Sequence, residues 1–222
     1  MSEDEQWDEV RAGVLAAGES VVALLAEPAV AERWEDPSLL PEMTVGELAA
    51  HMSQMLTAAV GWLGGEADQT LVESSIGAIY GSARVTTDEG IDGEVATKIR
   101  SWARAGAVDG PSKVVARTAK DVAGLGALLP SLCAGRIVPS VTCPGAGMRA
   151  DDYLRTRCVE LLVHADDLAS SIGVTPPSPD PRAASAAIHA LLAICRERVG
   201  DLAVLRALSR PDRADPDALR AL

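Results

Sequence analysis

The chain has 222 residues, a length that allows one domain with an extension or two small domains. It carries 20 Lys and Arg residues against 32 Asp and Glu residues, so its formal net charge is −12 and its surface repels phosphate groups. This charge, together with only four tryptophans and two tyrosines for base stacking, argues against nucleic acid and anionic membranes as partners.

The sequence begins with a strong helix pattern. Ser2 and Glu5 have the spacing of a capping box, and apolar residues recur behind them at steps of three and four. This pattern predicts a helix over residues 3–26. Residues 28–43 contain several prolines, which favour a connector with a short helical piece at Trp34.

A second helix is predicted from a second capping box. Thr44 and Glu47 have the same spacing as the first pair, and an apolar face follows them with His51 at its centre. Gly64 and Gly65 then end the helix.

The middle of the sequence is less regular. Residues 66–93 predict a broken helix around Leu71–Tyr80 followed by a loop, and a third helix is expected near 94–105. A further helix is expected from 111 to about 130. Residues 135–148 combine β-branched pairs with prolines and glycines, which favours a loop with strand-like fragments.

The longest regular helix pattern covers residues 151–171, and further helices are expected over 180–199 and 201–208. No strand pattern recurs. We therefore predict an all-α fold, an up-down four-helix bundle with additional short C-terminal helices. We expect residues 1–175 to form the bundle, and 176–222 a proline-rich connector and a helical extension that packs on it.

The cysteines and the N-terminus indicate the compartment. Cys133, Cys143, Cys158 and Cys195 form no Cys-x-x-Cys pair and are expected to be reduced thiols. The acidic start, MSEDEQWDE, is unlike a basic secretory signal, and no uncharged apolar run approaches the roughly 20 residues that a membrane span needs. A soluble, cytoplasmic protein is the expectation.

The 151–171 helix carries a polar stripe. At about 100° per residue, one face about 80° wide contains Tyr153, Arg157, Glu160, His164, Asp167 and Ser171. Core-type residues border it, namely Leu154, Leu161 and Leu168 on one side and Val159 and Val163 on the other. This pattern predicts a polar line inside the bundle, which must find partners there.

Part of this stripe suggests a metal site. Glu160 and His164 are four residues apart, so that both side chains could bind one ion, and His51 could approach from the second helix. Two imidazoles and a carboxylate form a known set for catalytic Zn²⁺ with an open coordination position. Asp167 could accept a hydrogen bond from His164, and Arg157 could orient Glu160 or hold a substrate carboxylate.

Residue spacing alone leaves alternatives open. His51 could be a hydrogen-bonded core histidine, since a single histidine on an apolar face is more often structural. The charged residues of the 151–167 stretch could be a solvated salt-bridge face, because Arg155 has the right spacing to pair with Asp151 or Asp152.

Two blocks of sequence resemble a known family. "EDPSLLPEMTVGELAAHM" and, about a hundred residues later, "MRADDYLRTRCVELLVHADDLASSIG" resemble the mycothiol-dependent maleylpyruvate isomerase family, within the DinB-like superfamily of metal-binding four-helix bundles. The resemblance implies that His51, Glu160 and His164 bind a divalent metal, usually zinc. It also implies that mycothiol, a low-molecular-weight thiol, binds the metal through sulfur and becomes the nucleophile toward a small electrophilic substrate.

The resemblance does not fix the reaction. In the isomerases proper a further C-terminal domain supplies a functional arginine, and here Arg206 and Arg210 are the candidates for that role, with surface positions as the alternative. A mycothiol S-transferase is therefore the broader reading beside the isomerase. A metal hydrolase that uses bound water and a non-catalytic metal-binding bundle remain as alternatives.

Overall fold

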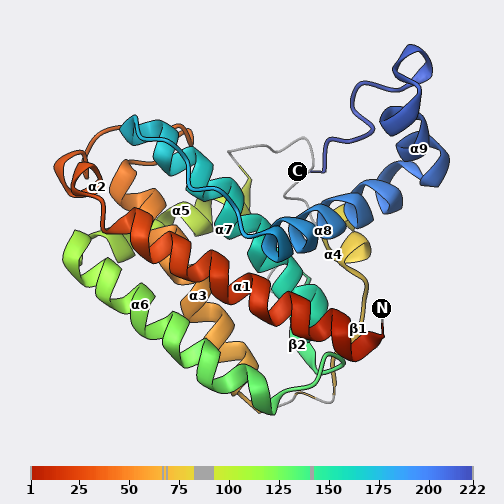
Figure 1. Ribbon diagram of the computed structural model, residues 1–222, viewed down its shortest axis with the longest axis horizontal. Helices are drawn as coiled ribbons and strands as arrows, with labels where there is room; N and C mark the ends of the chain where they lie inside the picture. The colour runs from red at the N-terminus through yellow and green to blue at the C-terminus, as the bar shows by residue number, and fades with distance from the viewer. Residues whose placement is uncertain (1, 67, 69, 83–92, 141–142, 222) are drawn as a thin grey trace.

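The computed structural model describes residues 2–66, 68, 70–82, 93–140 and 143–221. Its centre is a bundle of four helices (Figure 1): α1 (Glu3–Leu25), α3 (Val45–Gly64), α6 (Pro111–Leu128) and α7 (Ala150–Ile172). Helices α6 and α7 each pack against both α1 and α3. The fold is all-α, as the sequence predicts.

The four helices do not simply alternate in direction. In Figure 1, α1 and α7 run one way and α3 and α6 run the other. Polar contacts confirm that α3 and α6 are parallel, because Arg117 donates to Ser53 and, one turn further on both helices, Thr57 donates to Asp121. Helix α5 (Glu94–Ala107) packs on α3 and lies between α3 and α6 in the chain, which allows these helices to share a direction.

The helix ends agree with the sequence. Both capping boxes are formed: Ser2 and Glu5 start α1, and Thr44 and Glu47 start α3. At the other end of α7, Gly173 has φ of 76°, a left-handed conformation that favours glycine and stops the helix.

One further long helix, α8 (Pro181–Val199), packs on the bundle. The remaining elements are short: α2 (Pro28–Glu32), β1 (Val72–Glu73), α4 (Ile76–Ser82), the 3₁₀ turn η3 (Leu129–Ser131), β2 (Ile137–Pro139), β3 (Ala146–Arg149), α9 (Asp201–Ser209) and η4 (Pro211–Arg213). Strand β3 pairs parallel with β1 and antiparallel with β2. Trp34 was expected on a short helical piece but follows the end of α2.

The segment before Tyr80 corrects one prediction. A broken helix was expected over Leu71–Tyr80, but Val72 and Glu73 form β1 and only the end of that range is helical. Pairing with β3, far along the chain, holds this stretch extended. The loop expected next falls largely on residues 83–92, which lie outside the described residues.

Helix α4 is held against α8. A Cβ on Gly77 would lie 2.9 Å from the carbonyl oxygen of Ala193 and 2.6 Å from Cβ of Glu197, so α4 approaches α8 more closely than a larger residue would allow. Helix α8 also packs on α1 and α7. The close approach of α4 fixes the position from which Tyr80 reaches α7.

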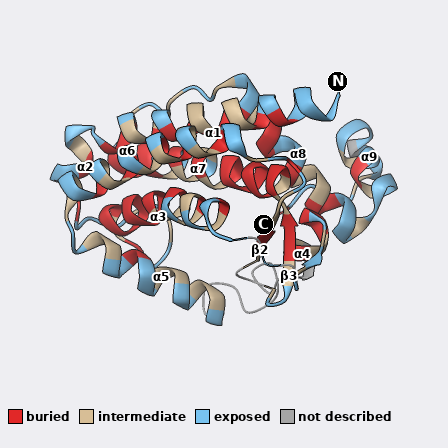
Figure 2. Cartoon of the chain, turned by 90° about the horizontal axis from the view of Figure 1, so that it is seen from below, coloured by how far each residue is buried: buried red, intermediate tan, exposed pale blue. Residues whose placement is uncertain are grey.

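Burial follows the bundle. Figure 2 shows buried residues concentrated on α1, α3 and α7 where these helices face one another, whereas α5 and α9 each contain one buried residue. Within the described ranges, none of the helices combines the length and the apolar character that crossing a membrane requires.

Candidate metal centre

The polar stripe of α7 lies at the edge of the core. Tyr153, Arg157 and Ser171 are buried, and the other members, Glu160, His164 and Asp167, are half-buried. The leucines on one flank, Leu154, Leu161 and Leu168, are fully buried. On the other flank Val163 is 45% exposed, so the prediction that core residues border the stripe on both sides is wrong there. The stripe therefore borders solvent on this side.

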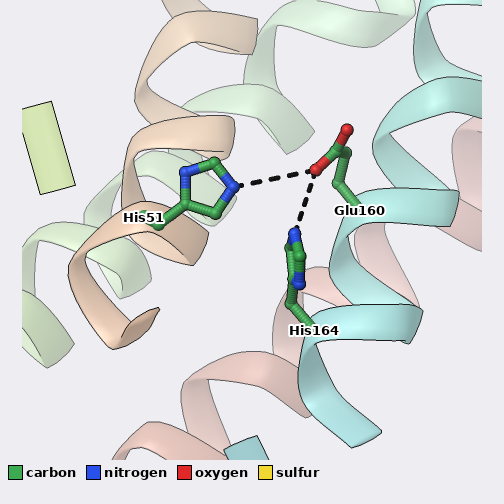
Figure 3. A group of neighbouring side chains, drawn as sticks. All are labelled: His51, Glu160 and His164. Atoms are coloured by element: carbon green, nitrogen blue, oxygen red, sulfur yellow. Dashed lines mark ion pairs between the residues drawn. The ribbon is translucent and has the colours of Figure 1, made fainter. Parts of the chain in front are cut away.

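His51, Glu160 and His164 form a compact group (Figure 3). His51 Nε2 lies 3.8 Å from Glu160 Oε2, and His164 Nε2 lies 3.3 Å from the same oxygen. The two imidazole rings have centroids 5.0 Å apart and meet at 71°. One potential ligand atom from each residue lies within 4.8 Å of the others. The structure thus brings together the three residues that the sequence suggested as ligands.

The helices explain this convergence. Glu160 and His164 are one turn apart on α7, so both side chains leave the same face of that helix. His51 comes from α3, which packs beside α7, and its side chain is only 6% exposed. Two rigid, adjacent helices therefore fix the relative positions of all three side chains.

The group fits a zinc-like ion. In a tetrahedral site with bonds of about 2.0–2.1 Å, neighbouring ligand atoms are roughly 3.3–3.4 Å apart. The observed separations of 3.3 and 3.8 Å from Glu160 to the two imidazoles are close to this spacing. Two imidazole nitrogens and one carboxylate oxygen are also the donor types of catalytic zinc sites that leave a position for another ligand.

Asp167 orients one imidazole. Its Oδ2 lies 3.0 Å from His164 Nδ1. If Nδ1–H donates to this carboxylate, the lone pair of Nε2 points toward Glu160 and is available to a metal. Burial lowers the pKa of His164, but the hydrogen bonds to Asp167 and Glu160 raise it more, to about 9.

Glu160 is negatively charged at neutral pH. Burial raises the pKa of its carboxyl group, but hydrogen bonds from His164 and His51 and the charge of Arg157 hold the pKa well below its usual value. The group therefore presents an ionised carboxylate to a cation.

Arg157 lies one turn before Glu160 on α7 and is buried. Its Nη1 donates to Sδ of Met55 at 2.9 Å, and its Nη2 donates to the hydroxyl of Tyr80 at 3.3 Å. Further hydrogen bonds go to the Thr156 hydroxyl, and the guanidinium carbon lies 5.0 Å from the ring centroid of Tyr153.

The sequence did not single out Tyr80 as a site residue. Tyr80 and Tyr153 are the only tyrosines of the chain, and both contact the guanidinium of Arg157. Burial raises the pKa of both phenols, so both keep their protons at neutral pH. The small number of tyrosines was the one feature of the sequence that could have drawn attention to Tyr80, but it did not indicate that Tyr80 contacts Arg157.

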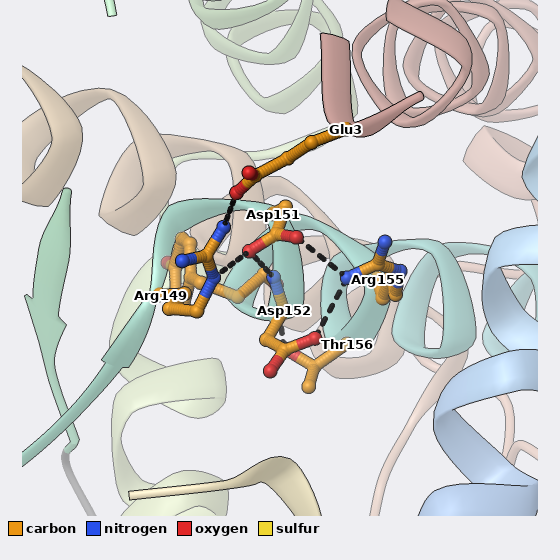
Figure 4. A network of polar contacts seen from close by, with 7 residues as sticks. Glu3, Arg149, Asp151, Asp152, Arg155 and Thr156 are labelled. Carbon is orange, nitrogen blue, oxygen red and sulfur yellow. Dashed lines mark hydrogen bonds and ion pairs between the residues drawn. The ribbon is translucent and has the colours of Figure 1, made fainter. Parts of the chain in front are cut away.

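The alternative of a solvated salt-bridge face does not hold at the start of α7. Arg155 is 8% exposed, and its Nη1 donates to Asp151 at 3.0 Å and to Asp152 at 2.7 Å. Arg149 also pairs with Asp151 and with Glu3 of α1 (Figure 4). Arg155 and Asp151 form the buried part of this network, whereas Glu3 is exposed, and the network is separate from the candidate ligands.

The structure does not bring Arg206 or Arg210 to this group. Arg206 lies on α9 and Arg210 directly follows it, and both are exposed. Helix α9 packs on α8 and extends away from the bundle in Figure 1. Cys143 lies against α4, where its sulfur donates to the carbonyl of Ile79 at 3.7 Å.

A comparison with known families agrees with this arrangement. The family model described as the mycothiol maleylpyruvate isomerase N-terminal domain matches residues 14–169, which is more than half of the chain and includes His51, Glu160 and His164. Searches of curated proteins and of solved structures gave no match. With its helical bundle and this match, the chain belongs to the mycothiol maleylpyruvate isomerase N-terminal domain family.

Proposed function

We propose that this protein is a metal-dependent enzyme that uses mycothiol as its nucleophile toward a small electrophile, as a thiol S-transferase or as an isomerase of the maleylpyruvate type. The observation that carries the proposal is the convergence of His51, Glu160 and His164 within the region that matches the family. The family description names both the thiol and an isomerase, and the donor set suits zinc with one position left for a thiol.

His51, Glu160 and His164 would hold the ion, and Asp167 would keep the His164 ring in the tautomer that offers Nε2. A bound zinc ion lowers the pKa of a coordinated thiol, so that the thiolate is present at neutral pH. Glu160 supplies the one negative charge of the ligand set. The centre therefore keeps a net positive charge, which favours an anionic sulfur ligand.

Access to the group is one-sided. The His51 side chain is 6% exposed, whereas those of His164 and Glu160 are 17% and 22% exposed. Thiol and electrophile would enter from the exposed edge of α7, and α3 would exclude water behind them.

The test compares two histidine variants. His51→Ala removes a proposed ligand, while His189→Ala removes the one histidine outside the group, an exposed residue of α8. We expect the purified protein and His189→Ala to contain about one divalent ion per chain and to consume electrophiles, maleylpyruvate included, only when mycothiol is added. His51→Ala should lose both properties.

Two outcomes would contradict the proposal. Unchanged metal content in His51→Ala would remove the ligand assignment. Turnover that needs metal but not thiol, with added thiol acting as an inhibitor, would indicate a hydrolase that uses bound water.

A further inference from the structure

Arg157 is a buried cation that forms no ion pair within the part of the chain that the structure describes. Among the described residues, no Asp or Glu oxygen lies within 4.0 Å of its guanidinium nitrogens, and all its hydrogen-bond acceptors are neutral: two hydroxyls and a thioether. A thioether is a weak acceptor. A buried guanidinium normally needs strong acceptors or a counter-ion to offset the loss of hydration.

The same helix shows how this chain satisfies a buried arginine. Two residues earlier, Arg155 is buried to a similar degree but donates to both Asp151 and Asp152 (Figure 4). Arg155 therefore has the carboxylate partners of a structural arginine, and Arg157 has only neutral acceptors. The charge of Arg157 also acts on Glu160, but its guanidinium has no anionic hydrogen-bond acceptor among the described residues.

A second unused donor lies beside Arg157. Tyr153 is 2% exposed, and its hydroxyl has no hydrogen-bond partner among the described residues. Its ring contacts both the guanidinium of Arg157 and the indole of Trp62, with a centroid separation of 5.8 Å to the latter. A buried hydroxyl without a partner costs free energy unless a ligand satisfies it.

These groups form the layer next to the candidate ligands. Met55 is one turn after His51 on α3, and Arg157 is one turn before Glu160 on the oppositely directed α7. The contact between Met55 and Arg157 therefore lies about one helical turn, roughly 5 Å, from the ligand layer. A substrate group a few bonds away from a metal-bound sulfur would reach Arg157.

We propose that Arg157, Tyr153 and Tyr80 form an anion subsite beside the metal centre, and that the electrophilic substrate carries a carboxylate which this subsite binds. Arg157 supplies the charge, and the Tyr153 hydroxyl donates a hydrogen bond that it does not make in the free protein. Met55, a flexible and half-buried side chain, yields its place on Nη1 to a carboxylate oxygen.

This assignment rests on the proposed function. The carboxylates of Glu160 and Asp167 lie 3.3 and 3.0 Å from His164, and together they would offset the charge of a divalent ion when both histidines are neutral. Neither carboxylate forms an ion pair with Arg157, so a substrate carboxylate would be the first anionic acceptor of its guanidinium.

The experiment uses stable conjugates of mycothiol as probes. In one series the sulfur carries a carboxymethyl, carboxyethyl or carboxypropyl group, and in the matched series each carboxylate is replaced by a carboxamide of the same shape. Affinities are measured by calorimetry on zinc-loaded and zinc-free protein. For at least one chain length we expect the carboxylate to bind the zinc-loaded protein about 10-fold to 100-fold more tightly than its amide.

Substitutions of Arg157 test whether the preference for the carboxylate over the amide comes from the subsite. Arg157→Met should abolish the preference for carboxylate and change amide binding little, and Arg157→Lys should retain part of it. Arg104→Met is the control, because Arg104 is 68% exposed on α5, and it should leave the preference intact. Zinc content and Tm show whether each variant is folded.

Tyr153→Phe separates ligand binding from structure. It should reduce the carboxylate preference several-fold while Tm stays the same or rises, since the hydroxyl has no partner to lose among the described residues. A purely structural tyrosine would show the reverse, a lower Tm with unchanged preference. This variant also serves if Arg157→Met does not fold.

The outcomes distinguish the two proposals. If both series bind equally well, or if Arg157→Met weakens both equally, the subsite is rejected and the proposed function stands. Absence of binding by every conjugate also rejects the subsite. Free mycothiol is measured beside the conjugates, because only its thiol can bind zinc as a thiolate, and equal binding of mycothiol with and without zinc would reject the proposed function.

Discussion

His164 holds a proton that a metal ion must displace. Its imidazole lies between two carboxylates, those of Asp167 at 3.0 Å and Glu160 at 3.3 Å. Although burial lowers the pKa of His164, these partners raise it to about 9, so the metal-free protein carries an imidazolium at neutral pH. Zinc binding requires the neutral ring.

Zinc affinity is therefore predicted to rise with pH. Between pH 7 and about 9 the apparent affinity should increase roughly tenfold per unit, because one proton leaves His164 for each zinc bound, and it should level off above the pKa of His164. Calorimetry in two buffers with different ionisation enthalpies measures the released proton. Zinc binding without proton release at pH 7 would show that His164 is not a ligand.

Asp167 is predicted to strengthen the site without binding the metal. Asp167→Asn should leave zinc bound but lower its affinity about 10-fold to 100-fold, because the amide accepts the Nδ1–H of His164 more weakly than the carboxylate. Titration against a competing chelator gives the affinity. Asp166→Asn is the control, since Asp166 is the exposed neighbour on the same helix, and equal affinities in both variants would contradict the role of Asp167.

At the scale of elements, the start of α7 sets the position of the whole polar stripe. Asp151 lies in the first turn and accepts hydrogen bonds from Arg149, from Arg155 and from the backbone N–H of Asp152. Asp152 contacts only Arg155 among these arginines. Burial raises the pKa of Asp152, the charge of Asp151 raises it further, and Arg155 offsets part of the rise.

The two aspartates are therefore predicted to contribute unequally. Asp151→Asn should lower the free energy of unfolding by about 2–4 kcal/mol, since it weakens one charge-assisted hydrogen bond from the buried Arg155 and another from Arg149. Asp152→Asn should cost about half as much, because its ionised form is already disfavoured by its surroundings. Urea unfolding of the two variants measures the difference, and equal losses or a larger loss in Asp152→Asn would contradict this ranking.

At the scale of the whole molecule, local sequence patterns predicted the helices well. Capping residues and apolar periodicity placed α1, α3 and α7, and the spacing of Glu160 and His164 on one helix put both on one face. His51 could be assigned to the apolar face of its helix for the same reason. Such patterns state which side of a helix is buried, and this was enough to suggest the ligand group.

Long-range contacts were beyond these patterns. Strand β1 exists only because it pairs with β3, and the parallel packing of α3 and α6 depends on the path of the chain through α5. The contact between Tyr80 and Arg157 joins residues 77 positions apart, so neither sequence neighbourhood indicates it. That the Tyr153 hydroxyl has no hydrogen-bond partner in the described ranges likewise follows only from the three-dimensional structure.

The most direct test of the account is calorimetry of mycothiol binding to zinc-loaded and zinc-free protein, repeated in two buffers of different ionisation enthalpy. We predict tight binding only with zinc and the release of about one proton near neutral pH, because the free thiol has a pKa near 8.5 and the bound sulfur is a thiolate. Glutathione should bind poorly under the same conditions. Equal mycothiol binding with and without zinc, or no binding to either form, would contradict a metal centre built for a thiol nucleophile.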